Sequence, residues 1–232
     1  MIPTTFQPGN KYSVSVVAAV PVMGTSSPGA GRGGRSMPVP QAVGEEVHAV
    51  LLWADMLRFR VSAERLRDAE LATFLGDFYL RAGDLVHRHE GWVDKFMGDG
   101  MLATFGAQRR NSEPVPAALR AALSLEAEFP AFMAPWRKWQ PALKEMSLRM
   151  VLHAGKCFSG HLGGTVFPTH TVIGKNVNES AVLHRAAPDP GLYATREFLD
   201  LAKGALGKTR AVEVPGGKGK KNSGLYLIRA AG

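Results

Sequence analysis

Two aspartates of this chain stand where strand-like runs end or turn. Asp55 follows the apolar run 47–54, whose length suits a buried strand. Asp99 lies in Met97-Gly98-Asp99-Gly100 between two further strand-like runs, and an Asp-Gly pair in that setting predicts a hairpin turn. Carboxylates held there could bind Mg²⁺ or Mn²⁺ against a triphosphate, because hard cations take oxygen ligands and share them with phosphates. The pairing alone is not specific, since aspartate is also common in turns for conformational reasons.

Hydrophobic periodicity predicts that helices and strands alternate around these aspartates. Helical spacing covers 62–89, which could divide at Gly76, and also 117–132, 176–187 and 196–202. The remaining strand-like runs cover 47–54, 92–96, 101–105, 148–154, 157–162, 169–173, 192–194, 209–214 and 225–228. Gly155 is expected to separate two of these strands, and the stretch 135–141 shows no clear period. Such alternation without internal repeats predicts an α/β or α+β domain.

Length and composition limit the architecture. The 232 residues are 45% hydrophobic, which suits one globular core with a tail, and we expect residues 1–45, rich in Pro, Gly and Ser, to be a disordered leader before a domain over 46–232. The single Cys157 excludes an intramolecular disulfide, so a reducing cytoplasm is the expected location. The apolar run 16–23 is too short to span a bilayer, so no membrane partner is expected.

The net charge of +8 favours anionic partners, among them nucleic acid, acidic lipid and nucleoside triphosphates. Three of the positive charges, Lys11, Arg32 and Arg35, precede the first acidic residue, so the excess is partly a property of the leader. Aromatic residues do not interleave with basic ones along any stretch, which argues against a single-stranded nucleic-acid surface. We therefore expect a triphosphate partner and no nucleic acid. A basic module that binds nucleic acid remains an alternative hypothesis to test.

Four blocks of the sequence resemble the catalytic domain of class III adenylate and guanylate cyclases. The segment LVHRHEGWVDKFMGDGMLATFG, residues 85–106, is similar to the metal-binding hairpin of that family, and VLLWADMLRF, residues 50–59, is similar to its first metal strand. LRMVLHAGKCFSGHLGG, residues 148–164, resembles its His-x-Gly strand pair, and TVIGKNVNESAVL, residues 171–183, resembles its loop and helix with the Val-Asn pair. The blocks follow the family's order and cover most of 46–232.

The resemblance implies a ferredoxin-like α+β fold, with a mostly antiparallel seven-stranded sheet flanked by helices. It implies that Asp55 and Asp99 hold two Mg²⁺ or Mn²⁺ ions per site, and that a nucleoside triphosphate is converted to a 3',5'-cyclic monophosphate and pyrophosphate. Lys95 and Thr171 would recognise the purine, and this Lys/Thr pair is closer to adenylate than to guanylate cyclases. ATP is therefore the expected substrate.

The same resemblance implies a homodimer, with two head-to-tail copies and active sites in the cleft between them. Asn178 would orient the ribose from the partner subunit, and Lys218 could meet the terminal phosphates. The family has an arginine four residues after the asparagine, where it stabilises charge on the transferred phosphoryl group, but this chain has Val182. Losing one such donor typically costs about a hundredfold to a thousandfold in rate. Arg185, three residues further along the predicted helix, could substitute or could be a solvated arginine away from the phosphates.

The predicted phosphate loop also departs from the family. Glycine and threonine usually flank its phenylalanine, whereas this chain has Arg58-Phe59-Arg60. Glycine permits a tight backbone turn there, so the arginines could either add phosphate contacts or crowd the turn. Lys175 and Asn176 stand where Asp-Ala is usual. We therefore expect metal binding to survive better than turnover. Two hypotheses follow, an active adenylate cyclase and a degenerate cyclase domain that acts as a nucleotide-binding or dimerising regulator.

Overall fold

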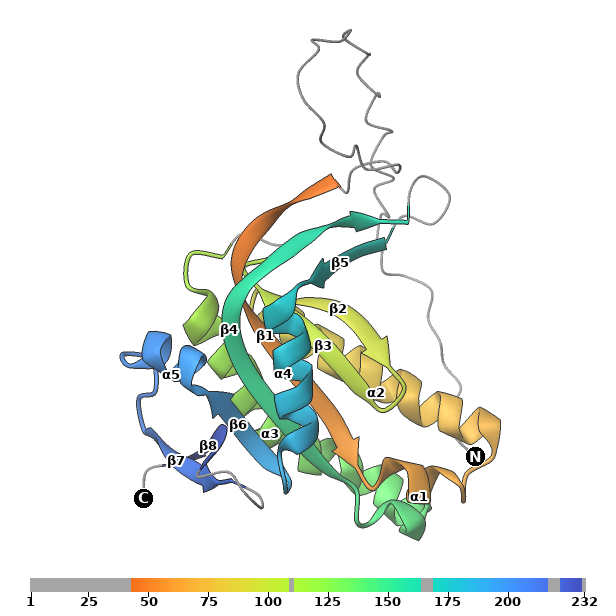
Figure 1. Cartoon of the computed structure of the whole chain (residues 1–232). Helices are drawn as coiled ribbons and strands as arrows, with labels where there is room; N and C mark the ends of the chain where they lie inside the picture. Colours follow the sequence, from red (N-terminus) through yellow and green to blue (C-terminus); the bar gives the residue numbers. More distant parts are fainter. Residues whose placement is uncertain (1–42, 109–110, 164–168, 217–221, 231–232) are drawn as a thin grey trace, which may run out of the picture. The chain divides into compact units, whose positions relative to one another are not determined.

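A computed structural model describes residues 43–108, 111–163, 169–216 and 222–230 (Figure 1). Lys218 and almost all of the predicted leader lie outside these ranges. The strands are β1 Val43–Leu57, β2 Trp92–Met97, β3 Gly100–Phe105, β4 Ser147–Leu162, β5 Thr169–Ile173, β6 Gly191–Thr195, β7 Thr209–Pro215 and β8 Asn222–Ala230. The helices are α1 Phe59–Ala63, α2 Asp68–Arg88, α3 Pro114–Trp139, α4 Lys175–Ala186 and α5 Arg196–Ala202, with a 3₁₀ turn at Pro141–Leu143.

The described strands form one sheet in the order β2-β3-β1-β4-β6-β8-β7, and β5 pairs with β4 off this path. All the pairings are antiparallel except that of β4 with β6. The expected α+β class with a mostly antiparallel sheet flanked by helices is therefore confirmed. The path contains the seven strands that the resemblance implies, and β5 makes an eighth.

The two faces of the sheet differ in what covers them. Along β1, Leu52 and Met56 face the main hydrophobic core, which is built with α2, α3 and α5. The alternate residues Leu51 and Trp53 face a smaller cluster that includes Val177 of α4. Figure 1 shows α4 crossing the front of the sheet while α2 and α3 lie behind it. Asp55, which lies two residues after Trp53, is therefore expected on the side of the sheet that α4 covers.

Helix α4 is fixed to the sheet by a short series of contacts with β1. Val177, Ser180 and His184 are its buried residues, and their spacing of three and four residues places them on one helical face. The indole Nε1 of Trp53 donates a hydrogen bond to Ser180 Oγ over 2.8 Å. The Trp53 ring also stacks on His184, with 5.9 Å between centroids. The opposite face of α4 is consequently left exposed.

Three element predictions were wrong. Gly155 does not interrupt β4, which runs unbroken across it; a Cβ there would lie 2.6 Å from Asn176 Cγ, so this glycine permits a close approach of α4. Helix α3 continues through Pro130 and Pro135 to Trp139, because burial of residues such as Met133 outweighs the lost backbone hydrogen bonds.

The third error concerns the first long helical segment. It divides at residues 64–67, between α1 and α2, rather than at Gly76. Gly76 lies within α2, where an added Cβ would meet nothing within 4 Å. Strand β1 also begins at Val43, three residues before the predicted start of the domain. In the described part of the chain, no helix combines the length and apolarity needed to cross a membrane.

Candidate active site

Asp55 lies near the end of β1, which continues two residues beyond it to Leu57. In the sheet it is paired with Gly100 of β3 on one side and with Arg149 of β4 on the other. A Cβ on Gly100 would lie 2.9 Å from the Ala54 carbonyl oxygen, so the missing side chain lets β3 approach β1 here. Because side chains alternate along a strand, Asp55 shares the α4 side of the sheet with Trp53.

Asp99 lies in the tight turn between β2 and β3, next to Asp55. Gly98 of this turn has φ 60°, a conformation that favours glycine. The turn is anchored by Tyr79 of α2, whose hydroxyl donates to the Gly98 carbonyl oxygen over 2.5 Å, and by the Met56 amide, which donates to the Asp99 carbonyl oxygen over 3.1 Å. Burial raises the pKa of the Asp99 carboxyl, and the negative charge of Asp55 raises it further. The two carboxylates therefore interact at one end of the sheet.

Asp55 is also in contact with two basic side chains. Arg149 donates from Nε to Oδ1 over 3.0 Å and from Nη2 to Oδ2 over 2.6 Å, which is a bidentate pair. His184 Nε2 lies 3.2 Å from Oδ1. Burial by itself would raise the pKa of Asp55, but the contacts with His184 and Arg149 outweigh burial and lower it. Neither partner was predicted from the sequence, where the only signal was an arginine in the otherwise apolar run 148–152.

Lys95 and Thr171, the predicted purine-recognition pair, are in direct contact. Lys95 Nζ donates to Thr171 Oγ1 over 2.7 Å, and both side chains converge on Asp94. Asp94 accepts from Thr171 Oγ1 over 2.9 Å and lies 3.0 Å from Lys95 Nζ. It also accepts from the Val172 amide and from Gln108 Nε2, and its side chain is 0% exposed. Asp94 was not predicted from the sequence as a member of this group.

A β-bulge explains why neighbouring residues of β2 can both reach this network. The register of β2 against β3 shifts between Val93 and Lys95, which leaves Asp94 without a paired residue. In a regular strand, Asp94 and Lys95 would point to opposite faces. The bulge instead lets the carboxylate of Asp94 hold the ammonium group and the threonine hydroxyl together.

The remaining predicted residues of α4 lie on its exposed face. Asn178 and Arg185 are exposed, and Val182 has 57% of its surface exposed. They therefore point away from Asp55 of the same chain, in positions where a second molecule could receive them. On the same helix, Lys175 Nζ forms an ion pair with Glu179 Oε1 at 3.6 Å.

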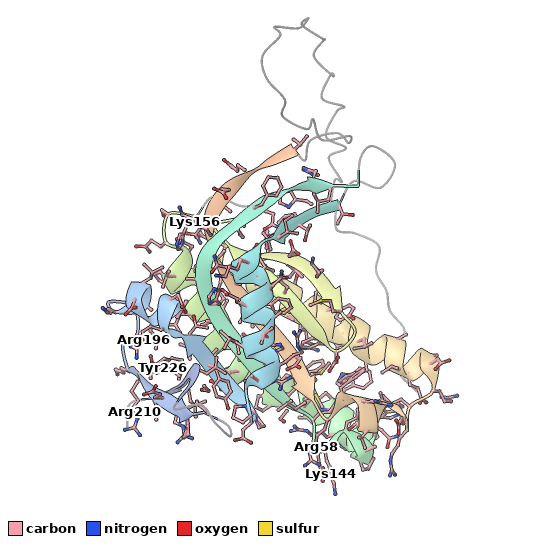
Figure 2. The ribbon with its side chains drawn as sticks, in the orientation of Figure 1. Arg58, Lys144, Lys156, Arg196, Arg210 and Tyr226 are labelled. Atoms are coloured by element: carbon pink, nitrogen blue, oxygen red, sulfur yellow. The ribbon has the colours of Figure 1, made fainter. Side chains whose placement is uncertain are left out.

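Arg58, Phe59 and Arg60 directly follow β1 but do not share one environment. Phe59 packs against the main core, whereas Arg60 is exposed and lies 3.9 Å from Glu64. Arg58 Nη1 donates to Glu145 over 2.5 Å. Figure 2 shows Arg58 and Lys144 at the same end of the domain, pointing away from the sheet; among the described residues they line a hollow of about 510 Å³ whose lining includes neither Asp55 nor Asp99.

Arg58 nevertheless keeps the turn that a glycine would favour. Its backbone has φ 62° and ψ 12°, which is the left-handed region. An arginine is strained in this conformation, and the chain turns tightly here although it has no glycine at this position. The Arg58 side chain is paired with Glu145 in this structure, and a phosphate contact of Arg58 or Arg60 stays a prediction.

The donor set of Asp55 and Asp99 fits a hard divalent cation in part. Carboxylate oxygens are preferred ligands of Mg²⁺ and Mn²⁺, and Mg²⁺ is commonly held by one or two carboxylates together with substrate phosphates. Within the described residues, no group of three or more His, Cys, Asp or Glu side chains is arranged to hold a metal ion. A metal here would accordingly need oxygens from outside the protein, of water or of substrate phosphates, to complete its coordination.

Comparison with known proteins finds uncharacterized relatives by sequence and solved cyclase structures by fold. No family model matches the chain. The chain is 31% identical over 144 residues to the uncharacterized protein Rv1319c of Mycobacterium tuberculosis, a match that covers 62% of this chain and 25% of that protein. The uncharacterized protein Mb1352c of Mycobacterium bovis is 31% identical over 161 residues, covering 68% and 28%. The chain thus spans about a quarter of the length of these curated relatives.

Among solved structures, the adenylyl cyclase CyaB from P. aeruginosa matches with a TM-score of 0.70 and 20% identity, over 80% of this chain and 95% of that one. The guanylate cyclase domain of RhGC from Catenaria anguillulae, solved with GTP, matches with a TM-score of 0.67 and 20% identity, over 80% and 98%. The catalytic core of a rhodopsin-guanylyl cyclase with converted specificity, solved with ATPαS, gives 0.69 and 20%, over 82% and 100%. The chain has the fold of these catalytic domains.

Proposed function

Because the chain has the fold of nucleotide cyclase catalytic domains, we propose that it converts a nucleoside triphosphate, ATP by preference, to the 3',5'-cyclic monophosphate and pyrophosphate. One observation carries the proposal: Asp55 of β1 and Asp99 of the β2–β3 turn are neighbours whose charges interact. In the reaction the ribose 3'-oxygen loses its proton and bonds to the α-phosphorus, and the bond to pyrophosphate breaks. A pair of divalent ions would supply the activation of that hydroxyl and the grip on the triphosphate.

The residues of this chain have separate tasks under the proposal. Asp55 and Asp99 hold Mg²⁺ or Mn²⁺, and Lys95 with Thr171 binds the purine. The contact of 2.7 Å between Lys95 and Thr171, held by buried Asp94, supports the base-recognition role because it fixes a donor and a hydroxyl in one geometry. The choice of ATP over GTP rests on this pair alone, so exchange of Thr171 for alanine should change the ratio of the two rates.

The proposal includes a homodimer in which each site combines two chains. Asn178 is exposed on α4 and would orient the ribose bound by the partner's aspartates. Exposed apolar side chains, Trp92 at 48% and Ile173 at 43%, support a surface that a second copy covers. Among the structures of similar fold, the guanylyl cyclase domain of RhoGC from Blastocladiella emersonii is described in a monomeric form and in a non-canonical dimeric form.

The direct test is to incubate the purified protein with each of the four nucleoside triphosphates and Mn²⁺ and to separate the products by chromatography. We expect cyclic AMP to form fastest, and Asp99→Ala to abolish its formation. Asp84→Ala is the matched control, because Asp84 is an exposed aspartate of α2 away from the site. The proposal fails if no cyclic product forms from any triphosphate at high protein concentration.

Subunit complementation tests the shared site. Asp99→Ala and Asn178→Ala should each be inactive alone. A mixture that exchanges subunits at random should recover about a quarter of the wild-type rate, because half of the dimers then contain one intact site. No recovery, with subunit exchange demonstrated by differential labelling, would place Asn178 in the same chain's site or outside any site.

A degenerate domain that binds nucleotide or dimerises without turnover is the second candidate. The observation in its favour is Val182, whose side chain is 57% exposed where the family resemblance expects the transition-state arginine. Val182→Arg separates the two candidates. A large gain in rate would show that the site is otherwise assembled and that the wild-type enzyme is weak for want of one donor. Nucleotide binding with no turnover in either protein would favour the regulator.

A further inference from the structure

The carboxylate of Asp55 is already bound by a cation that belongs to the protein. Both of its oxygens accept hydrogen bonds from the guanidinium of Arg149, at 3.0 and 2.6 Å. The third nitrogen of Arg149, Nη1, donates to the Ala187 carbonyl oxygen over 3.0 Å, just beyond the end of α4. The Arg149 side chain is 13% exposed and that of Asp55 is 22% exposed. The guanidinium is therefore held in place from two sides and is not a freely moving surface group.

His184 adds a second basic group on the same oxygen. Its Nε2 lies 3.2 Å from Oδ1 of Asp55, and this buried nitrogen has no other partner among the described residues. The imidazole cannot easily turn away, since it stacks on Trp53 and is buried under α4. Asp55 is thus in contact with basic side chains from β4 and α4, and its charge also interacts with that of Asp99.

A divalent ion that used Asp55 would need these same oxygens. Ligand oxygens lie roughly 2.0–2.6 Å from Mg²⁺ or Ca²⁺-type ions, so an ion bound to Asp55 would stand beside the guanidinium. Like charges at such a distance repel strongly where the surroundings are partly buried. Conversely, without an ion, the guanidinium offsets the repulsion between Asp55 and Asp99. The Arg149 guanidinium and a divalent ion can therefore each neutralise Asp55, but they cannot both do so at the same time.

We propose that Arg149 is an internal counter-ion that competes with the divalent metal for Asp55 and so lowers the metal affinity of the site. It is a positioning residue that acts through Asp55. This inference rests on the proposed function, because it takes Asp55 to be a metal ligand. Its consequence is that metal loading requires Arg149 to release at least one oxygen of Asp55, and an anionic triphosphate entering the site would give the released guanidinium a new partner.

The test is Mn²⁺ titration of the nucleotide-free full chain by isothermal calorimetry. Arg149→Met, which keeps an unbranched apolar stem but removes the charged guanidinium, should bind Mn²⁺ on the order of tenfold more tightly than wild type, the factor expected when hydrogen bonds to a charged group no longer compete. Arg149→Lys keeps the charge without the fork and should fall between the two. Arg81→Met is the matched control, because Arg81 donates to Asp77 over 2.8 Å on α2, and its affinity should equal that of wild type.

Thermal unfolding distinguishes competition between Arg149 and the metal from a purely structural role of Arg149. Without metal, Arg149→Met should unfold at a lower temperature than wild type, because Asp55 has lost its partner. Saturating Mn²⁺ should then raise its midpoint more than that of wild type. A merely structural salt bridge would lower the midpoint and leave the Mn²⁺ affinity unchanged or weaker. If Arg149→Met does not fold, the same comparison is made with Arg149→Lys.

Failure of this inference is distinguishable from failure of the proposed function. Equal Mn²⁺ affinity in wild type, Arg149→Met and Arg149→Lys overturns the competition, and the cyclase proposal still stands if Asp55→Asn abolishes binding and wild type forms cyclic product. If Mn²⁺ binds to none of the proteins and no cyclic product forms, the metal site itself is wrong and both proposals fall.

Discussion

The left-handed backbone at Arg58 makes a prediction whose sign can be worked out from the structure. Arg58 has φ 62° and ψ 12°, and this conformation costs a residue with a Cβ about 1–2 kcal/mol, whereas glycine adopts it freely. Glycine also gives the unfolded chain more freedom, which costs about 0.5–1 kcal/mol relative to alanine. Both replacements lose the exposed pair with Glu145, so that loss cancels in their comparison. Arg58→Gly should therefore be more stable than Arg58→Ala by about 0.5–1 kcal/mol.

Arg60 provides the control, because it lies two residues further on inside α1, where the backbone is helical. There the order should reverse, and Arg60→Gly should be less stable than Arg60→Ala by about 0.5–1 kcal/mol. Urea unfolding followed by far-UV circular dichroism measures all four variants under one condition. The reasoning is refuted if Arg58→Gly is no more stable than Arg58→Ala, or if positions 58 and 60 respond with the same sign.

Three further predictions concern buried groups. Asp94→Ala should lower the free energy of unfolding by about 1–3 kcal/mol, because it leaves the Thr171 hydroxyl and the Val172 amide without their buried acceptor while the half-exposed Lys95 ammonium can be solvated, and urea unfolding would show this. Burial lowers the pKa of His153 below 6.5, so as pH falls through 6.5 the unfolded chain takes up more protons and stability is lost; His153→Gln should flatten that slope in unfolding measured across pH. Burial, with a smaller effect of the Asp94 charge, raises the pKa of the Cys157 thiol to about 11, so iodoacetamide at mildly alkaline pH should leave the folded protein unmodified by mass spectrometry and should alkylate it in urea.

The local pattern of the sequence determined most of the elements. The Asp-Gly pair at 99–100 predicted the turn between β2 and β3, and apolar alternation predicted most strands within a few residues. The order of the four blocks predicted the α+β fold with its mostly antiparallel sheet. These features are readable because turn chemistry and side-chain period are local properties of the chain. Where local rules conflicted with burial, as at the prolines of α3, the core decided the outcome.

Only the tertiary structure decided what surrounds Asp55. Arg149 is 94 residues away in the sequence, and it reaches the carboxylate because the register of β1 against β4 places the two residues opposite each other. His184 reaches the same oxygen because α4 is fixed over β1 by Trp53 and Ser180. Asp94 joins Lys95 only through a bulge in β2. The sequence specified which groups can carry charge, but strand register and helix docking, set by packing along whole elements, determined which of those charges meet.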